Sequence, residues 1–280
     1  MVIKKKNVIH AIILIFITWC GNIIYYVNTE IDKPLFLKNY KEVSDNGMFQ
    51  LYNIDNSYKS NEMLYVIFPE IQSKPAYITN NENFSNNHYR LNNFNIDLRN
   101  IKTQNNEMLY DELKDKSFVI TKMIYGDIYG EEHEVDLGEI HLLKRKEEKK
   151  HQYDLYKRVG TQSTSDKKRG VLFRAWDNIS IDKVESNFYD QIKNKFEISI
   201  NNVPLDEIKV PLKINRYDDI YVESTDNTNE THDYSFEIKL NISDPEGSMD
   251  CIKFNVGNQI LYKDKILSSK FIKQLKNEGV

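Results

Sequence analysis

The stretch from Tyr234 to Ile242 alternates without exception between apolar and polar side chains. Its apolar positions are Tyr234, Phe236, Ile238, Leu240 and Ile242. Successive side chains of a β-strand point to opposite faces of the sheet, so this period of two places all five on one face. One apolar and one polar face are typical of an antiparallel sheet that buries one side and leaves the other in water.

Similar runs recur from Phe49 onward, separated by clusters of Asn, Asp, Gly and Lys. They predict further strands at 49–54, 63–71, 94–101, 117–126, 133–143, 196–200, 206–212 and 249–256. Gly138 inside one of these runs predicts a β-bulge. The pair Asn201-Asn202 tolerates the positive φ of a tight hairpin, and residues 244–247 predict a second turn.

Helical patterns are scarce. Alanine is rare, whereas isoleucine, tyrosine and asparagine are frequent, and this composition favours strands over helices. The stretch 105–115 predicts a short helix, and 268–277 predicts a terminal helix capped by Ser268 or Ser269.

The middle of the chain, residues 144–169, holds ten basic against four acidic residues and almost no apolar side chains. Such a composition cannot build a core, so it predicts a linker or a long exposed loop. It separates 33–145 from 170–280, and each part has the length of an immunoglobulin-like domain of about 100 residues. The sequence therefore predicts a mostly β fold with two antiparallel β-sandwich domains of the immunoglobulin-like kind.

Residues 1–30 carry a mostly apolar run from Val8 to Val27. About 20 residues at roughly 1.5 Å each match a hydrocarbon core about 30 Å thick. Lysines at 4–6 precede the run, whereas Glu30 and Asp32 follow it, so the positive-inside rule places the N-terminus in the cytoplasm and the body outside. We expect a single-pass signal-anchor in the cell membrane. The two cysteines predict no disulfide framework, which fits the cytosol and a bacterial cell surface equally well.

Three other interpretations of this run remain open. A cleaved export signal has a shorter apolar region of about 7–15 residues that ends in small residues, but Trp19 stands at that point here. Lipoprotein processing at Cys20 meets the same obstacle, so Cys20 is kept as a candidate lipidation site. The last interpretation is a buried core helix.

Carboxylates gather in two stretches. The first holds Glu131, Glu132, His133, Glu134, Asp136 and His141. On one strand Glu132 and Glu134 would share a face about 7 Å apart, near enough to bind a hard cation such as Ca²⁺. The second stretch, 215–234, includes Asp218 and Asp219 but lacks the order of an EF-hand loop. Both are candidate metal sites, with charged residues on the wet face of a strand or at a hairpin tip as the alternative.

The sequence has no phosphate-binding glycine loop, nucleophile elbow or zinc-protease motif. A net charge of −4 gives no indication of nucleic-acid binding, and a mean hydropathy of −0.60 excludes a multispan membrane protein. We expect no cofactor and a non-catalytic binding or structural module at the cell envelope. Its partner would be a protein, a glycan or an anionic envelope polymer. The alternative is an envelope hydrolase with two carboxylates about 5–10 Å apart in a cleft.

Overall fold

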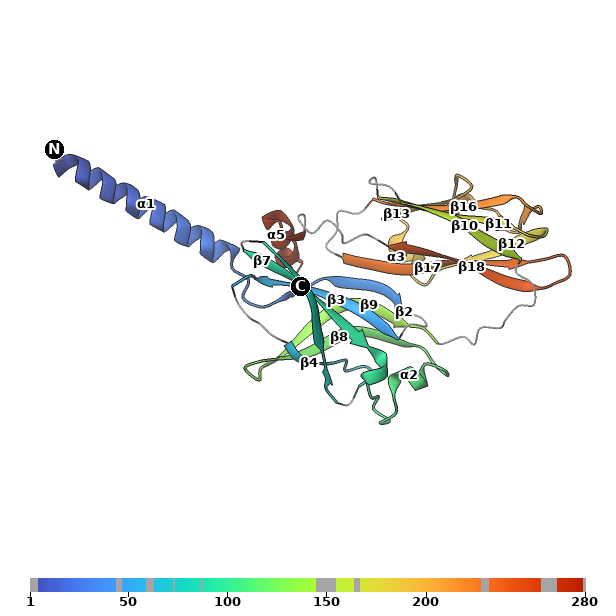
Figure 1. The fold of residues 1–280 in the computed structure, drawn as a ribbon, viewed down its shortest axis with the longest axis horizontal. Helices are drawn as coiled ribbons and strands as arrows, with labels where there is room; N and C mark the ends of the chain where they lie inside the picture. Colours follow the sequence, from blue (N-terminus) through green and yellow to red (C-terminus); the bar gives the residue numbers. More distant parts are fainter. Residues whose placement is uncertain are drawn as a thin grey trace.

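The computed structural model describes residues 5–43, 47–58, 63–72, 74–86, 88–144, 155–163, 167–227, 232–257 and 266–278. The chain is mostly β, as predicted, and its strands form several sheets. One long helix, α1 (Lys5–Thr29), projects away from the body (Figure 1). The apolar run therefore forms a single continuous helix.

The first half of the chain contains β1 (Leu35–Phe36), β2 (Lys38–Val43), β3 (Met48–Asn56), β4 (Met63–Ile67), β5 (Ala76–Tyr77), β6 (Thr79–Ser85), β7 (Tyr89–Asp97), η1 (Leu98–Asn100), α2 (Leu109–Glu112), β8 (Phe118–Asp127) and β9 (Glu132–Leu142). The second half contains β10 (Tyr156–Ser163), β11 (Lys168–Ala175), β12 (Ile179–Glu185), α3 (Tyr189–Ile192), β13 (Phe196–Ile200), β14 (Val203–Pro204), η2 (Leu205–Glu207), β15 (Leu212–Ile214), β16 (Asp219–Asp226), β17 (His232–Ser243), β18 (Met249–Gly257) and α5 (Ser269–Asn277).

A single nine-stranded sheet runs through both halves, in the order β15-β12-β17-β2-β9-β8-β4-β5, and β18 also pairs with β17. The halves meet where β2 pairs in parallel with the start of β17, from Lys38 opposite His232 to Lys41 opposite Ser235. The pairing of β2 with β9 is also parallel. The prediction of purely antiparallel pairing is therefore wrong at β2, although the other ladders between named strands are antiparallel.

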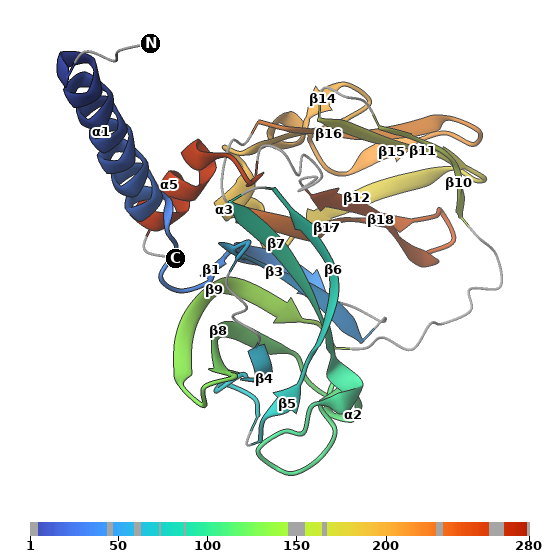
Figure 2. The ribbon, with the colours of Figure 1, turned by 60° about the vertical axis from the view of Figure 1, so that its left-hand side comes forward.

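Two further sheets cover parts of this large one (Figure 2). The order β1-β3-β7-β6 forms the smaller sheet of the first half, and β10-β11-β16-β13-β14 forms that of the second half. One apolar core takes its buried residues from positions 36–142, and another takes them from positions 155–256. Each half of the chain thus buries its own core, while the nine-stranded sheet connects the two.

The alternating stretch in β17 has the buried face that its sequence predicts. Tyr234, Phe236, Ile238, Leu240 and Ile242 are each at most 2% exposed. The predicted hairpin is also present, because β13 pairs with β14 across Asn201 and Asn202, whose φ values are 51° and 65°. Its second arm is shorter than expected, since residues 205–207 form η2 and β15 joins β12 instead.

Gly138 marks the predicted bulge in β9. Ile120 of β8 pairs with Ile140, but Lys122 pairs with Asp136, so β9 inserts extra residues between these two pairs. The φ of Gly138 is +83°, and a Cβ added there would lie 2.5 Å from the backbone oxygen of Asn39 on β2. Glycine therefore allows both the bulge and the close approach of β2.

The prediction of an exposed linker over 144–169 is wrong for its second part. Residues 156–163 form strand β10, which pairs with β11 from Tyr156 opposite Ala175 to Ser163 opposite Arg169. Backbone hydrogen bonds hold this edge strand, and its side chains are mostly exposed, so it shows no apolar period. Residues 145–154 and 164–166 of the predicted linker lie outside the described part of the chain.

The terminal helix α5 begins as predicted, because Ser268 Oγ accepts a hydrogen bond from the backbone N–H of Phe271 at 3.3 Å. Its position, however, differs from the predicted domain 170–280. Ile272 and Leu275 are buried in a third core together with Ile31, Leu35, Leu37, Ile54, Tyr89 and Leu91. The last helix of the chain thus packs on the first half.

Candidate functional site

Helix α1 is long and apolar enough to cross a membrane from Val8 to Thr29, with a mean hydropathy of 2.0 over its most apolar window. None of that window is buried, so the interpretation as a core helix of the body is wrong. A cleaved signal sequence would meet the same criteria of length and composition. The predicted ends of the span, Val8 and Val27, both lie inside the helix, as does Cys20, which is half-buried.

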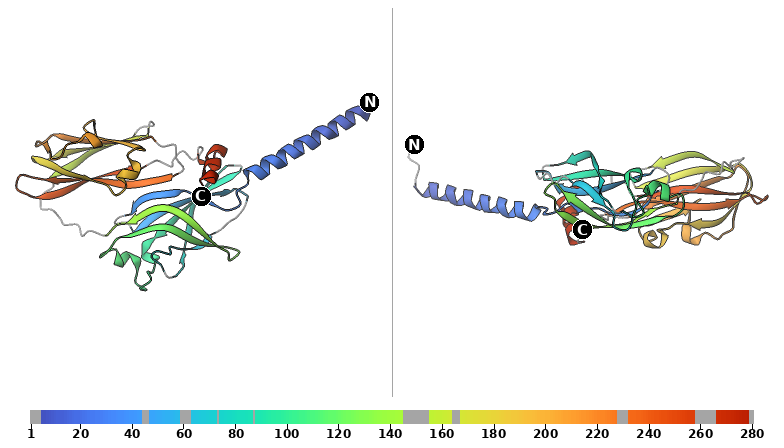
Figure 3. Two further views of the ribbon diagram at one scale, coloured as in Figure 1. Left: turned by 180° about the vertical axis from the view of Figure 1, so that it is seen from behind. Right: turned by 90° about the horizontal axis from the view of Figure 1, so that it is seen from below.

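Aromatic contacts attach the end of α1 to the body. The ring of Tyr25 lies 5.7 Å from that of His88, and Tyr26 stacks on Tyr58 at 5.4 Å. Tyr89 Oη donates a hydrogen bond to the backbone oxygen of Thr29 at 3.0 Å. The helix therefore continues into a packed joint with the body (Figure 3).

The predicted metal ligands Glu132 and Glu134 each bind a neighbouring side chain. Glu132 accepts a hydrogen bond from Tyr65 Oη at 2.8 Å. Glu134 lies 2.7 Å from Lys122 Nζ in an exposed ion pair. Each of these two carboxylates therefore has its own side-chain partner, as expected for charged residues on the solvent-exposed face of a strand.

A different group in the same hairpin comes closer to a ligand set. The ligand atoms of Asp127, Glu131 and His133 all lie within 4.8 Å of one another, and His133 Nε2 lies 3.2 Å from Asp127 Oδ2. Burial alone would raise the pKa of Asp127. Hydrogen bonds from the Glu131 backbone N–H and the His133 side chain outweigh this effect, so the pKa of Asp127 is lowered. Burial and the charge of Asp127 raise the pKa of the neighbouring Tyr125 to about 12. Sequence reasoning missed Asp127, because it precedes the acidic stretch.

The second pair of predicted ligands, Asp218 and Asp219, also has protein partners. Arg174 holds Asp219 with two hydrogen bonds of 2.7 and 3.1 Å, and this contact lowers the pKa of Asp219. Asp218 Oδ2 accepts hydrogen bonds from the backbone and side-chain N–H groups of Asn215, at 3.1 and 3.0 Å. Asp218 therefore closes the turn before β16, and Asp219 connects β16 to β11 through Arg174.

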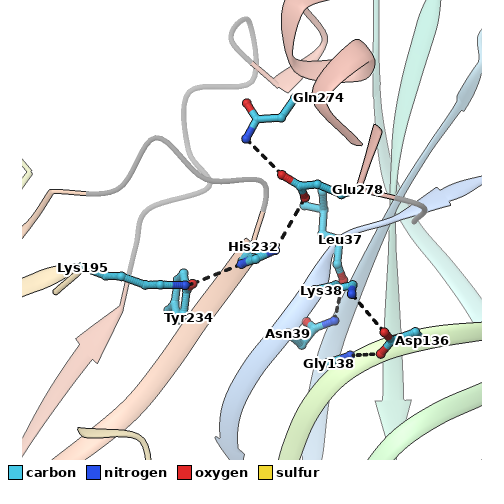
Figure 4. A network of polar contacts seen from close by, with 10 residues as sticks. All are labelled: Leu37, Lys38, Asn39, Asp136, Gly138, Lys195, His232, Tyr234, Gln274 and Glu278. Atoms are coloured by element: carbon cyan, nitrogen blue, oxygen red, sulfur yellow. Dashed lines mark hydrogen bonds and ion pairs between the residues drawn. The ribbon is translucent and has the colours of Figure 1, made fainter. Parts of the chain in front are cut away.

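Polar side chains from both halves meet where β17 joins β2 (Figure 4). Tyr234 Oη accepts a hydrogen bond from Lys195 Nζ at 2.6 Å and lies 3.1 Å from His232 Nδ1. His232 Nε2 lies 3.6 Å from Glu278 Oε2, and Gln274 of α5 donates a 3.1 Å hydrogen bond to the other oxygen of Glu278. The network thus connects β17 to the terminal helix.

A buried ion pair crosses the same join. Lys41 of β2 contacts Asp233 of β17, and both side chains are 9% exposed. The Lys41 ammonium also donates a 2.7 Å hydrogen bond to the backbone oxygen of Gln50. These residues line a polar cleft of about 430 Å³ together with Tyr52 and Arg169. The cationic and anionic groups at the base of this cleft neutralise each other, so their contact holds the halves together.

The end of the second half that lies farthest from α1 exposes aromatic side chains. The β11–β12, β15–β16 and β17–β18 turns lie at this end, because Ser180 pairs with Ser243 and Ile179 pairs with Ile214 (Figure 1). Trp176 is 41% exposed and Tyr217 is 55% exposed. Their rings stand edge to face with centroids 5.9 Å apart, and the guanidinium of Arg216 lies 4.8 Å from the Tyr217 ring centre. We call Trp176, Arg216 and Tyr217 the distal aromatic patch.

The backbone at Tyr217 has a φ of +67°, which is uncommon for a bulky residue. A left-handed conformation costs about 1–2 kcal/mol for a residue with a Cβ. Two hydrogen bonds hold the turn, from Tyr217 N–H to the oxygen of Ala175 and from Asp218 N–H to the oxygen of Asn215. Backbone strain of this kind clusters at functional sites.

A hollow of about 650 Å³ adjoins the distal aromatic patch through Asp218. Its lining includes the apolar residues Ile200, Val203 and Leu212 and the polar residues Asn201 and Lys213. An apolar lining with a few hydrogen-bonding groups is typical of a small-ligand site. This site was missed from the sequence, because Trp176 and Tyr217 lie in turns that show no pattern.

No protein-family model matches the chain, and no curated protein matches it either. A solved structure described as the anomalous substructure of Titin-A168169 aligns with 79% of this chain and 96% of its own, at 9% sequence identity and a TM-score of 0.22. A TM-score this low carries no information about function.

Proposed function

We propose that this chain is a membrane-anchored, extracytoplasmic binding module whose distal aromatic patch takes a glycan. The observation that carries the proposal is the exposed pair of Trp176 and Tyr217, held at the far end from α1 by a strained turn. Exposed aromatic rings on a strained scaffold offer contact area at a low entropic cost.

The anchor in this proposal is α1, inserted as an uncleaved single span from Val8 to Val27. The lysines before the span and the acids after it favour a cytoplasmic N-terminus. Tyr25 and Tyr26 fall at the outer boundary, where aromatic residues are enriched. Two immunoglobulin-like sandwiches, one around each core of the body, would then carry the distal aromatic patch away from the membrane.

A glycan fits the chemistry of the distal aromatic patch and its hollow. The C–H faces of a sugar ring stack on aromatic side chains, while its hydroxyl groups need donors and acceptors nearby. Lys213 and the Oδ1 atom of Asp218 offer such groups around the hollow, while the other oxygen of Asp218 binds Asn215. Two of the carboxylates predicted for hydrolysis or metal binding, Glu134 and Asp219, are engaged in ion pairs. Their engagement supports a non-catalytic role.

Binding can be measured by isothermal titration calorimetry of the full chain in detergent micelles against a panel of hexose and N-acetylhexosamine oligosaccharides. Replacing Trp176 by alanine is expected to lower the affinity for the bound oligosaccharide at least about tenfold, because truncation of an aromatic hot-spot residue costs about 2 kcal/mol or more. Tyr129→Ala is the matched control, since Tyr129 is 77% exposed but lies in the β8–β9 turn. Equal losses in both variants would contradict the proposal, as would an absence of binding by the unmodified chain.

Tyr217→Gly separates binding from folding. Glycine relieves the left-handed backbone, which offsets the lost ring contacts of about 0.5–1.5 kcal/mol. We expect the free energy of unfolding to stay within about 1 kcal/mol of the original value, whereas the affinity for the oligosaccharide falls at least about tenfold. A folded variant that binds normally would show that Tyr217 has no role as an anchor, and a variant that unfolds easily would show that the ring serves the fold.

A further inference from the structure

Helix α5 lies beside the base of α1, although nearly the whole chain separates them (Figure 2). Lys276 Nζ contacts the backbone oxygen of Glu30, which directly follows α1. Asn86 adds a 3.1 Å hydrogen bond to the backbone oxygen of Leu267, just before α5. These contacts fix α5 at the level where α1 leaves the body.

The two sides of α5 differ in chemistry. Ile272 and Leu275 are buried against the first half of the chain. Lys270, Lys273 and Lys276 recur every third residue and are all exposed. Positions three apart are neighbours on a helix surface, so the lysines form one row. Lys270 and Lys273 lie on the side that faces away from the core, and Lys276 ends the row at its contact with Glu30.

The acidic residues nearby do not cancel this row. Glu278 is engaged by Gln274 and His232, on the side of the helix that faces β17. Asp32 is exposed and is followed directly by the exposed Lys33. The exposed charge along α5 is therefore positive.

We propose that the lysine row of α5 binds the phosphate headgroups of the membrane in which α1 is inserted. The inference rests on the proposed anchor, because α1 sets the distance between α5 and the bilayer. Tyr25 and Tyr26 belong at the interface, and α5 is attached only a few residues beyond them, at Glu30. Lysines this close to an anionic surface are attracted to it within a Debye length, about 8–10 Å at moderate salt. The row then gives the body a second contact with the membrane and limits its rotation about α1.

The test uses the full chain reconstituted into vesicles of phosphatidylcholine alone or of phosphatidylcholine mixed with phosphatidylglycerol. Exposed lysine amines are acylated briefly, and the modified positions are quantified by mass spectrometry. We expect Lys270 and Lys273 to react several-fold more slowly on the anionic vesicles, with the difference removed by high salt. Lys209 and Lys213 are internal controls, because both are exposed near the distal aromatic patch, and we expect them to react equally on both vesicles.

Flotation of the same vesicles separates the two possible failures. Protein that does not float with either vesicle would overturn the anchor itself. Protein that floats with both vesicles, but whose Lys270 and Lys273 react equally on each, would overturn the headgroup contact and leave the anchor standing. A decrease at Lys209 and Lys213 equal to that at α5 would show general adsorption and would also overturn the proposal.

Discussion

Replacing Gly138 by alanine is expected to lower the free energy of unfolding by about 2–5 kcal/mol. The positive φ accounts for about 1–2 kcal/mol of this loss. The new Cβ would lie 2.5 Å from the backbone oxygen of Asn39 and 3.0 Å from its nitrogen. Neither atom can move without shifting β2, and an overpacked site of this kind typically adds about 1–3 kcal/mol. Urea denaturation of the full chain in micelles, followed by near-ultraviolet circular dichroism, measures the change.

Gly130→Ala is the matched control for this variant. Gly130 has nearly the same φ, +81°, but nothing lies within 4 Å of an added Cβ. We therefore expect only the backbone contribution, about 1–2 kcal/mol. Equal losses in the two alanine variants would show that the approach of β2 to β9 does not depend on glycine.

Replacing Lys41 by methionine is expected to lower the free energy of unfolding by about 3–5 kcal/mol, because it leaves the carboxylate of Asp233 buried without its cation. Methionine has a similar length, so the loss reports on charge and not on a cavity. The backbone oxygen of Gln50 also loses its donor. The same denaturation experiment measures the effect.

The double variant Lys41→Met/Asp233→Leu tests this explanation. Removing both charges eliminates the uncompensated carboxylate, so we expect its stability to return to within about 1 kcal/mol of the original chain or to exceed it. Lys122→Met is the surface control, because Lys122 and Glu134 are 55% and 58% exposed, and its expected loss is below about 1 kcal/mol. A double variant as unstable as the single one would contradict the charge explanation.

The structural features that the sequence predicted depend on local chemistry. The apolar face of β17 follows from its period of two, and the cap of α5 follows from a serine before an apolar helix face. Asn201 and Gly138 are residues whose backbones tolerate positive φ, so a hairpin and a bulge could be placed from single positions.

Strands β2 and β10 show what local chemistry cannot predict. Asn39 and Lys41 are buried polar residues of β2. The partners of Asn39 lie between β1 and β2 and in β9, and those of Lys41 lie in β3 and β17. A polar residue at such a position looks like a surface residue until its distant partner is known. Strand β10 is held at an edge by its backbone, which leaves no apolar period in its sequence. Fold class was therefore easier to predict than the join between the halves.

The candidate sites likewise include features that the local sequence predicts and features that only distant partners determine. The acidic stretch around Glu132 was visible as composition, but the register of the β8–β9 hairpin decides that Asp127, Glu131 and His133 are the residues that meet. Trp176 and Tyr217 come from turns 41 residues apart in the sequence, which are joined by hydrogen bonds at Ala175 and Asn178. Proximity of that kind arises from the folded chain and has no sequence signature.

The contact between Lys276 and Glu30 joins residues 246 positions apart. During synthesis, the apolar side chains of the first half that pack with Ile272 and Leu275 stay uncovered until these two residues have left the ribosome. Contacts of such separation form slowly, because a long loop must close first. The joint between α1 and the body is thus completed late, and a nascent chain stalled before residue 266 would expose these apolar side chains to chaperones.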